Sequence, residues 1–359
     1  MCKYGLIGAG MMGQEHIRNI ALIEHAEVTA ILEPDVAMRA EAAALAPGAT
    51  PHDTLGSMLA QPDLDAILIA SPNHLHARQM EEIAGTRPLP LLVEKPLFTS
   101  AYDKDVIDRL ARHYEAPIWV AMEYRYMPPI AAFLREAVEA TGGIKMLTIR
   151  EHRFPFLQKV GHWNRFNKNT GGTLVEKCCH FFDLMRYVLA DEPVRVMASG
   201  GQDVNHLHEV YTGERSDIWD NAYVIVDFAK GTRAMLELCM FAEGSRYQEE
   251  IVAVGPEGKI EAFVPGPARF WPEGEDLPEP QLVISPRSTK TRITKAIPVD
   301  PELLIAGDHN GATFYQHQRF LDVVNGTGAV EVTLTDGARA VEMGLAAQRS
   351  AETGQAVAL

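Results

Sequence analysis

The segment LVEKCCHFFD, residues 174–183, collects acidic, basic, thiol and imidazole side chains within ten residues. Side chains of these types could bind a metal ion, form a redox-active dithiol or transfer protons. On one continuous helix, at about 100° per residue, Glu176, His180 and Asp183 would lie within about 60° of one another. We therefore predict a helical face that carries two carboxylates and an imidazole.

The two adjacent cysteines do not favour a metal or redox site. On the same helix Cys178 points away from the polar face and Cys179 lies to one side of it, so few ligands could converge on an ion. A bond between these neighbours would require a strained ring. Cys2 and Cys239 complete the four cysteines, none at zinc-site or disulfide-framework spacing. We predict reduced thiols and no metal site.

A glycine-rich loop, GAGMMG, follows the apolar strand of residues 4–7 and precedes a helical pattern. In dinucleotide-binding folds the first glycine allows a tight turn, the second lets the backbone approach a pyrophosphate, and the third lets the helix pack on the strand. The loop residues at these places and at the helix start are Gly8, Gly10, Met11, Met12 and Gly13. We predict that they bind the phosphates of a dinucleotide at the helix N-terminus.

Glu33 ends the next apolar strand, twenty residues after Gly13. A carboxylate in this place accepts hydrogen bonds from the ribose hydroxyls of NAD and repels the 2′-phosphate of NADP. The next arginine is Arg39, so no guanidinium is expected directly beside that phosphate. NAD is therefore the predicted cofactor, and NADP is disfavoured.

Several further stretches resemble the Gfo/Idh/MocA oxidoreductases, a family that includes inositol dehydrogenases and glucose-fructose oxidoreductase. Besides the glycine loop, they are ASPNHLHA at 70–77, EKPL at 94–97, YRYMPP at 124–129 and GGTLVEKCCHFFDL at 171–184. The C-terminal stretch from residue 315 is also similar to the family's. The resemblance therefore extends over both halves of the chain.

The resemblance implies hydride transfer between a nicotinamide and a secondary alcohol of a sugar, inositol or related polyol. Lys95 matches the family's E-K-P lysine beside the nicotinamide ribose and the reacting hydroxyl, and His180 matches its acid/base histidine. Such groups take up the proton that the cofactor does not accept. Glu176 stands where the family usually has Asp, and we predict that it orients His180 or binds a substrate hydroxyl.

The family positions and the ends of the predicted strands add further candidates. Additional cofactor contacts are predicted from Ser71, Asn73, His76, Glu94 and Lys95. Predicted substrate contacts are Arg125, Trp163, Arg165, Asp183 and His309. The loop around Trp163 could present an aromatic face to a sugar ring or be an exposed turn, and His309, at a helix start, could equally be a surface residue.

The elements that must position these residues divide the chain into two parts. Up to residue 123, apolar strands alternate with helical stretches, the pattern of a parallel sheet covered on both faces. Beyond it, long strands joined by short glycine-containing turns predict an open, mainly antiparallel sheet. We predict an α/β protein, with a doubly wound Rossmann domain at 1–123 and an α+β substrate-binding and oligomerisation domain at 124–359.

Two features of the second part carry finer predictions. The proline-rich, acidic stretch 265–281 is predicted to form a surface loop. The chain should end with helices over about 311–324 and 336–353, the second with Thr335 as its N-cap and Gly354 just past its end.

Composition excludes some partners. The chain has 359 residues and a net charge of -15 at pH 7, which argues against binding to nucleic acid or an anionic membrane surface. No apolar run reaches the length of a membrane span, and the N-terminus lacks the pattern of a signal peptide. We expect a cytoplasmic protein, and the resemblance implies a homodimer or homotetramer formed through the C-terminal sheet.

The sequence leaves two other functions open besides the dehydrogenase. Some relatives retain NAD and use transient oxidation to cleave a glycosidic bond, but they carry a different pattern, with Tyr and His, in place of Glu176 and His180. The other alternative is a cofactor-binding sensor without turnover, against which Lys95, Glu176 and His180 weigh. A dehydrogenase is the favoured prediction.

Overall fold

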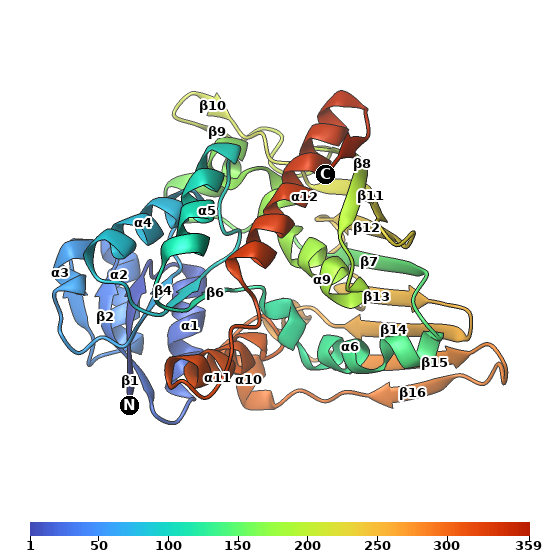
Figure 1. Ribbon diagram of the computed structural model, residues 1–359, viewed down its shortest axis with the longest axis horizontal. Coiled ribbons are helices and arrows are strands. Elements are labelled where there is room, and N and C mark those ends of the chain that lie inside the picture. Colours follow the sequence, from blue (N-terminus) through green and yellow to red (C-terminus); the bar gives the residue numbers. More distant parts are fainter.

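The computed structural model describes residues 1–359 as two β-sheets with their covering helices (Figure 1). The predicted fold class is confirmed: a six-stranded parallel sheet is followed by a nine-stranded, mostly antiparallel sheet. One continuous hydrophobic core joins the two parts.

The first sheet has the strand order β3-β2-β1-β4-β5-β6. All of its strand pairs are parallel. The direction of progression reverses between β1 and β4, and doubly wound sheets bind their ligands at the carboxyl ends of the strands at such a point. The strands are β1 (Cys2–Ile7), β2 (Ala26–Leu32), β3 (Thr50–His52), β4 (Ala66–Ile69), β5 (Leu91–Val93) and β6 (Ile118–Val120).

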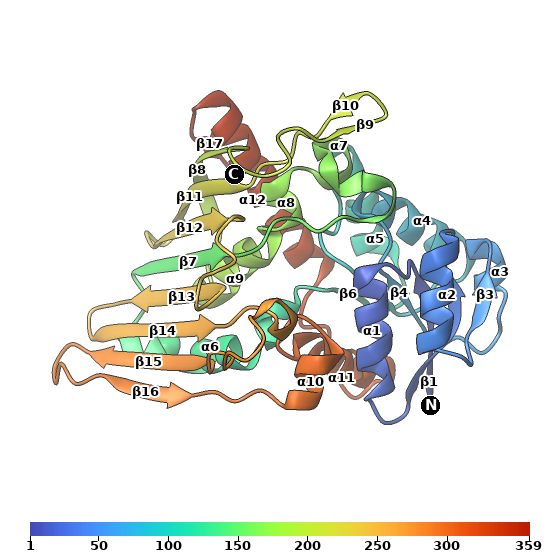
Figure 2. The ribbon, with the colours of Figure 1, turned by 180° about the vertical axis from the view of Figure 1, so that it is seen from behind.

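Helices cover both faces of this sheet, which explains why its strands are apolar throughout. Helices α4 and α5 lie on the face turned to the viewer in Figure 1, and α1 and α2 lie on the opposite face (Figure 2). The helices are α1 (Met11–Ala21), α2 (Val36–Leu45), α3 (Leu55–Leu59), α4 (His76–Thr86) and α5 (Lys104–His113).

The second sheet has the order β16-β15-β14-β13-β7-β12-β11-β8-β17. Only β7 and β12 pair in parallel. The turns at residues 229–232 and 255–257 join antiparallel neighbours, as their glycines predict. The strands are β7 (Met146–His152), β8 (Pro193–Gly201), β11 (Asn221–Phe228), β12 (Arg233–Cys239), β13 (Glu249–Val254), β14 (Gly258–Val264), β15 (Gln281–Pro286), β16 (Ile293–Ala296) and β17 (Val357–Ala358). A separate hairpin consists of β9 (Val210–Tyr211) and β10 (Glu214–Arg215).

Helices cover one face of the second sheet only. Helices α6 (Pro128–Thr141), α9 (Cys179–Leu189) and α12 (Leu334–Thr353) lie on the face seen in Figure 1, whereas Figure 2 shows the other face without a covering helix. Tyr223 and Ile225 on β11 are exposed. Assembly of copies through this open face stays a prediction.

Helices from the end of the chain join the two parts. Helix α11 (Ala312–Val324) packs on α1, and α12 packs on α5 and β6 as well as on α9 and β8. Segments from both sides of residue 123 share one hydrophobic core. The domain boundary at this residue therefore stays a prediction. The remaining helices are α7 (Asn167–Thr170), α8 (Thr173–Glu176) and α10 (Pro301–Ala306).

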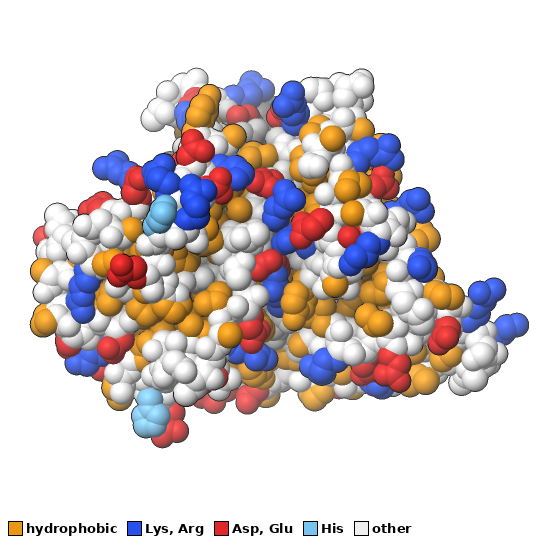
Figure 3. Space-filling model, in the orientation of Figure 1, with side chains coloured by type: hydrophobic (Ala, Val, Ile, Leu, Met, Phe, Trp, Pro, Cys, Tyr) orange, Lys and Arg blue, Asp and Glu red, His pale blue; other side chains and the backbone are white.

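The surface is mixed in charge on the face that Figure 3 shows. Lys and Arg side chains lie among Asp and Glu side chains there. No helix of the structure has the length and apolar character needed to cross a bilayer.

The start of α12 corrects one prediction. Its N-cap is Thr333, not Thr335, because Thr333 and Asp336 form a reciprocal capping box. At the other end Gly354 adopts the left-handed conformation, as predicted (φ 67°).

Replacing Thr333 with Ala should lower the free energy of unfolding by about 1 kcal/mol, since the backbone N–H of Asp336 would lose its acceptor, the Thr333 hydroxyl. The matched control is Thr335→Ala, at an exposed threonine two residues later in the first turn of α12. It should leave the free energy of unfolding within about 0.5 kcal/mol of that of the original protein. Urea unfolding followed by circular dichroism measures both. Equal losses in the two variants would contradict the capping assignment.

Candidate active site

A cavity of about 600 Å³ opens where β1 and β4 end, at the predicted cofactor position. Nine of the eleven residues predicted to contact the cofactor line it: Gly8, Gly10, Met11, Met12, Glu33, Ser71, Asn73, Glu94 and Lys95. Gly13 and His76 do not. The buried side-chain N–H of Asn73 has no partner in the protein, as expected of a group that binds a ligand.

The three glycines of the loop have different surroundings. A side chain at Gly8 or Gly13 would collide with backbone, since a Cβ at Gly8 would lie 2.6 Å from Ser71 and one at Gly13 only 2.2 Å from the Gly8 oxygen. A Cβ at Gly10 would meet no atom within 4 Å. No side chain caps α1 at Gly10, so the helix N-terminus faces the cavity and suits a pyrophosphate.

Carboxylates line one end of this cavity. Glu33 is buried and accepts hydrogen bonds from the backbone N–H groups of Ala9 (2.6 Å) and Asp35 (2.8 Å). Arg39 is turned to the Glu33 carbonyl and to Asp53 and does not line the cavity. The acidic residues on this wall are Glu33, Asp35, Glu41 and Asp53. Negative charge at this end disfavours the additional phosphate of NADP.

His76 does not contact the cofactor cavity. It is completely buried, and its ring nitrogens lie 2.9 Å from the Pro96 carbonyl and 3.0 Å from the Ser71 carbonyl. Its position at the first turn of α4 directs the ring inward, between two loops. His76 therefore positions the loops that carry Ser71 and Lys95.

The glycine contacts predict opposite effects for two similar substitutions. Gly10→Ala should leave stability within about 1 kcal/mol but weaken NAD binding at least about 10-fold, because the added methyl points into the cavity. Gly13→Ala should lower the free energy of unfolding by about 2–3 kcal/mol, because the Gly8 backbone must move. Urea unfolding and NAD titration by protein fluorescence test this. Unchanged NAD affinity in Gly10→Ala would contradict the assignment of the cavity.

A second cavity of about 560 Å³ meets the first. Both are lined by Met11, Met12, Gln14, Lys95 and Lys159. Glu176, His180 and His309 line the second cavity only. The structure thus brings Lys95 and His180, 85 residues apart in the chain, to the walls of one space.

Glu176 and His180 do not lie on one continuous helix, and that prediction was wrong. Helix α8 ends at Glu176 and α9 begins at Cys179, with Cys178 as the N-cap of α9. The interruption contains Lys177, whose ammonium group lies 2.8 Å from a buried carboxylate oxygen of Glu151. Both residues still reach the cavity, because the two helices follow each other closely.

Two lysines surround Glu176. Lys95 donates a hydrogen bond from Nζ to the Glu176 carbonyl (3.2 Å), and Lys159 donates to Oε1 of its carboxylate (3.3 Å). Oε2 of Glu176 is buried without a partner. This carboxylate therefore retains a free acceptor at the wall of the cavity.

His180 is buried and stacks on Tyr124, with 4.0 Å between the ring centroids and an interplanar angle of 8°. Its Nδ1 has no partner. Burial, followed by the positive charges of Lys95, Lys177, His309 and Arg153, holds the pKa of His180 well below its usual value. The imidazole is therefore neutral at pH 7 and able to accept a proton.

Arg125 and Asp183 were predicted to contact substrate, but neither lines the second cavity. They form a buried ion pair, with hydrogen bonds of 2.6 and 2.5 Å. Arg125 also donates to the Glu331 carbonyl (3.0 Å). Asp183 lies one turn beyond His180 on α9 and points to the η3 segment Glu123–Tyr126 instead. The pair fastens these segments together.

Trp163 and Arg165 also lie outside the second cavity. Trp163 lines the cofactor cavity, where its ring packs edge-on against His74 (centroids 6.3 Å apart) and Lys159 lies 4.5 Å from its centroid. Arg165 is buried and pairs with Glu209 at 2.7 Å. The loop is thus not an exposed turn: Trp163 packs at the cofactor cavity, and Asn164 of the same loop lines the second cavity.

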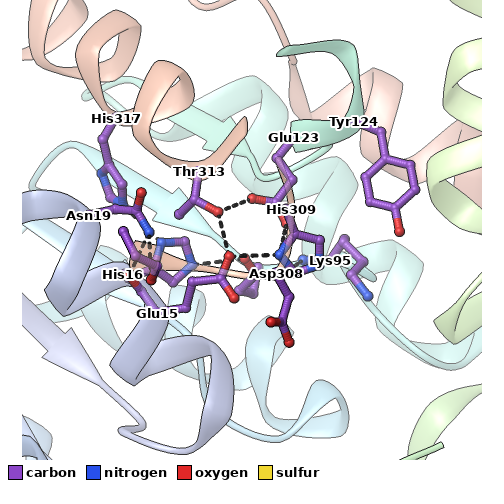
Figure 4. A network of polar contacts seen from close by, with 12 residues as sticks. Glu15, His16, Asn19, Lys95, Glu123, Tyr124, Asp308, His309, Thr313 and His317 are labelled. Carbon is purple, nitrogen blue, oxygen red and sulfur yellow. Dashed lines mark hydrogen bonds and ion pairs between the residues drawn. The ribbon is translucent and has the colours of Figure 1, made fainter. Parts of the chain in front are cut away.

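His309 lies in the cavity wall and is held by two carboxylates from other elements (Figure 4). Its Nδ1 is 2.7 Å from Glu15 on α1 and 3.5 Å from Glu123. The hydroxyl of Thr313 on α11 lies within hydrogen-bond distance of both carboxylates, at 3.1 and 2.6 Å. Burial opposes a charge on the ring, but Glu123 and Glu15 outweigh it and raise the pKa of His309 to about 9.

Sequence reasoning found His309 but missed Glu15, Glu123 and Thr313. Glu15 and His309 are 294 positions apart, and no spacing signal connects them. Beside this network, His16 lies 2.9 Å from Glu94 and 2.8 Å from His317. Polar residues of α1 thus occupy the boundary between the two parts of the chain (Figure 4).

Part of the stretch 265–281 is a wall of the second cavity, not only a surface loop. Pro267, Ala268 and Arg269 line the cavity. Arg269 forms a bidentate ion pair with Asp308, which stands next to His309. The prolines that suggested a peripheral loop restrict this segment where it closes the site.

The thiols and the possible metal ligands form no second site. No group of three or more His, Cys, Asp or Glu side chains is arranged to hold a metal ion. Cys178 and Cys179 are free and buried. Burial raises the pKa of Cys179 to about 12, so this thiol is neutral at pH 7.

The raised pKa of His309 predicts a dependence of stability on pH. An unfolded histidine titrates near 6.5, so the ion pairs of His309 should stabilise the fold fully below that pH and be lost as the pH rises through about 9. His309→Gln should be less stable by about 2–3 kcal/mol at pH 6, with the difference disappearing near pH 10. His208→Gln, at an exposed histidine, is the matched control. A difference that persists unchanged to pH 10 would contradict a charged His309.

Comparison with known proteins agrees with this geometry. Residues 2–122 match the NAD-binding Rossmann fold of the Gfo/Idh/MocA oxidoreductases, and residues 135–359 match the C-terminal alpha/beta domain of the same family. The chain belongs to this oxidoreductase family. The resemblance identified from the sequence motifs is therefore confirmed. The predictions that the protein is an oxidoreductase and that it has an NAD-binding domain are confirmed as well.

Individual members of the Gfo/Idh/MocA family are similar over most of their length. An inositol 2-dehydrogenase of Rhizobium meliloti is 28% identical over 313 residues, which cover 86% of this chain and 89% of the relative. The rhizopine catabolism protein MocA of the same species is 26% identical over 277 residues, or 76% and 80% of the two chains.

Solved structures of the family share the whole fold. Levoglucosan dehydrogenase in complex with NADH superimposes with a TM-score of 0.80 at 22% identity, covering 99% of this chain and 98% of its own. The myo-inositol dehydrogenase of Lactobacillus casei, in complex with NAD(H) and myo-inositol, gives 0.75 at 20% identity, covering 100% and 97%. At these identities the likeness establishes the fold alone.

Proposed function

We propose that the protein is an NAD-dependent dehydrogenase that oxidises a secondary alcohol of a sugar, an inositol or a related polyol. The observation that carries the proposal is the junction of the two cavities at Lys95, with His180 in the wall of the second. An alcohol in the second cavity would meet both a proton acceptor and a cationic hydrogen-bond donor beside the cofactor.

The residues of the first cavity fit NAD. The open side of Gly10, the uncapped start of α1 and the unpartnered N–H of Asn73 suit a pyrophosphate and its ribose oxygens. Glu33 retains acceptor capacity for ribose hydroxyls beside its two backbone partners. NAD, when bound, supplies the hydride acceptor for the reaction.

His180 and Lys95 divide the work on the alcohol. As the C–H hydride leaves, the hydroxyl proton passes to the neutral imidazole of His180, and Lys95 donates a hydrogen bond to the oxygen. The cations that lower the pKa of His180 also favour negative charge on that oxygen. The proton and the hydride together account for the two hydrogens that an alcohol loses on becoming a ketone.

Glu176 has the role of a substrate-binding residue in this proposal. Its Oε2 is buried, unpartnered and at the cavity wall, so it can accept a hydrogen bond from a second substrate hydroxyl. Lys159 restrains its other oxygen. Inositol 2-dehydrogenases among the relatives support a polyol as the substrate class.

Assembly through the open face of the nine-stranded sheet belongs to the same proposal. Exposed Tyr223 and Ile225 form an apolar pair on β11, near the β8–β17 edge of this face, with Asp227 and Arg195 pairing further along. A surface of this kind is suited to a symmetric contact with a second copy.

The test is a panel of inositols, aldoses and polyols with NAD, followed by the absorbance of reduced nicotinamide. Substrate oxidation is expected, with kcat about 10²- to 10⁴-fold lower in His180→Ala and in Lys95→Met. NAD affinity should be unchanged in His180→Ala, because His180 does not line the cofactor cavity.

His113→Ala is the matched control, at an exposed histidine of α5, and should retain full activity. Cleavage of an aryl glycoside in the presence of NAD, without oxidation of any alcohol, would replace the proposal with a glycosidase. NAD binding without turnover of either class would favour the sensor.

A further inference from the structure

We infer that the substrate carries a carboxylate next to its polyol part, and that Arg153 and Lys177 bind this carboxylate. The inference rests on the proposed function and names the substrate class more closely. It predicts a sugar acid, such as a uronic acid, in place of a neutral sugar or inositol.

The second cavity is rich in cations although the chain is acidic. The chain carries a net charge of -15. Six basic side chains line the cavity against three acidic ones. They are Arg18, Lys95, Arg153, Lys159, Lys177 and Arg269, facing Glu15, Glu176 and Asp308. This reversal of charge points to an anionic ligand.

Several of these cations already have a counter-ion. Arg269 pairs with Asp308, and Lys159 pairs with Glu176. Lys95 and Arg18 donate to backbone carbonyls. Lys95 lies at the junction with the cofactor cavity, where the reacting hydroxyl is expected.

Arg153 and Lys177 differ from these four cations because both pair with one and the same carboxylate, that of Glu151. Arg153 Nη1 lies 3.2 Å and Lys177 Nζ 2.8 Å from the same oxygen of Glu151. The next carboxyl group, Glu249, has its pKa raised to about 7 by burial and by the charge of Glu151, so it neutralises them only in part. Burial and the charge of Arg153 lower the pKa of Lys177 to about 8, so the pair carries only a small net positive charge beside Glu151, which suits a monoanion better than a phosphate dianion.

The donors needed for a carboxylate are available. Arg153 uses Nη1 for Glu151 and Nε for the Phe154 carbonyl, and its Nη2 has no acceptor in the protein. Lys177 donates one hydrogen bond to the Tyr124 hydroxyl (2.5 Å) and pairs with Glu151. The third N–H of its ammonium group is therefore free to bind a ligand. A guanidinium beside an ammonium group is suited to the two oxygens of a carboxylate.

The position of this pair relative to His180 fits one sugar ring. Lys177 hydrogen-bonds to the Tyr124 hydroxyl, and the ring of Tyr124 stacks on His180. The Lys177 ammonium group lies 4.9 Å from the centroid of the Tyr124 ring, and the centroid of the His180 ring lies 4.0 Å from the same point on the stacked face. A hexose-sized acid can place a hydroxyl at His180 and its carboxylate at Lys177 and Arg153 at the same time.

The experiment compares matched pairs of substrates on the complete protein. Oxidation of D-glucuronate and D-galacturonate with NAD is measured against D-glucose and D-galactose, with glucose 6-phosphate as a dianion. We expect kcat/KM about 10- to 100-fold higher for the acids than for the neutral sugars, since charge-assisted hydrogen bonds have this strength.

Arg153→Gln should remove the preference for the acids, lowering kcat/KM about 10- to 100-fold more for the acids than for the neutral sugars, mainly through KM. Arg153→Lys should restore part of it. Arg150→Gln is the matched control, three residues earlier on β7 and paired on the outer side with Glu237 and Glu250. An equal loss with acids and neutral sugars in Arg153→Gln would assign Arg153 a structural role and overturn the inference.

Binding is measured separately from turnover, by calorimetric titration of glucuronate and glucose. Oxidation of neutral sugars or of glucose 6-phosphate in preference to the acids would overturn the inference and leave the dehydrogenase proposal intact. Binding of glucuronate that depends on Arg153, without reduction of NAD by any substrate, would support the acidic ligand and overturn the dehydrogenase proposal. If Arg153→Gln does not fold, the inference is tested by the substrate preference of the unchanged protein and of Arg153→Lys. A preference for the acids in both supports it, and its absence in the unchanged protein overturns it.

Discussion

The close contact between Gly13 and the backbone of Gly8 is the constraint on which the site depends. With only 2.2 Å between a hypothetical Cβ at Gly13 and the Gly8 oxygen, no other residue lets α1 approach β1 so closely. The N-terminus of α1 then faces the cofactor cavity. Further along the helix, Glu15 and His16 reach the boundary with the C-terminal helices. One backbone contact therefore sets the geometry of both cavities.

Buried charge is the second organising feature. Glu15, Glu123 and His309 come from three separate segments; both carboxylates are buried and the imidazole is partly buried. Burying an ion pair costs desolvation energy that the pairing only partly offsets, so such clusters specify an arrangement more than they stabilise it. The same holds for Arg125 and Asp183, which fasten α9 to the segment before α6. These ion pairs fix the position of the second-cavity wall that carries His180.

The buried cations also determine the character of the second cavity. Burial lowers the pKa of His180, and the charges of Lys95, Lys177 and Arg153 lower it further. They create at the same time an environment in which a negative oxygen is favoured. One arrangement of charge thus underlies both the acid/base chemistry and the anionic substrate that we propose.

Local signals in the sequence predicted much of this protein. The spacing of Gly8, Gly10 and Gly13, the position of Glu33 and the alternation of strands and helices each depend on neighbours close in the chain, so the Rossmann half and its cofactor cavity were predictable. Lys95 and His180 followed from their motifs. The open antiparallel sheet followed from its glycine turns, although a shift of two residues separated the predicted cap of α12 from Thr333.

Only the tertiary structure decided which charged residues line the second cavity. Arg125 and Asp183 were candidates by position, but each satisfies the other inside the core. Arg153 lies outside every motif, and Lys177 lies within the 171–184 motif without a predicted role. They meet at Glu151 because this residue of β7 lies beside the break between α8 and α9. A sequence determines periodicity and local caps, whereas the pairing of a buried charge depends on which distant segment arrives beside it. The family and its cofactor fold were therefore readable from the chain, and the charge of the substrate cavity was not.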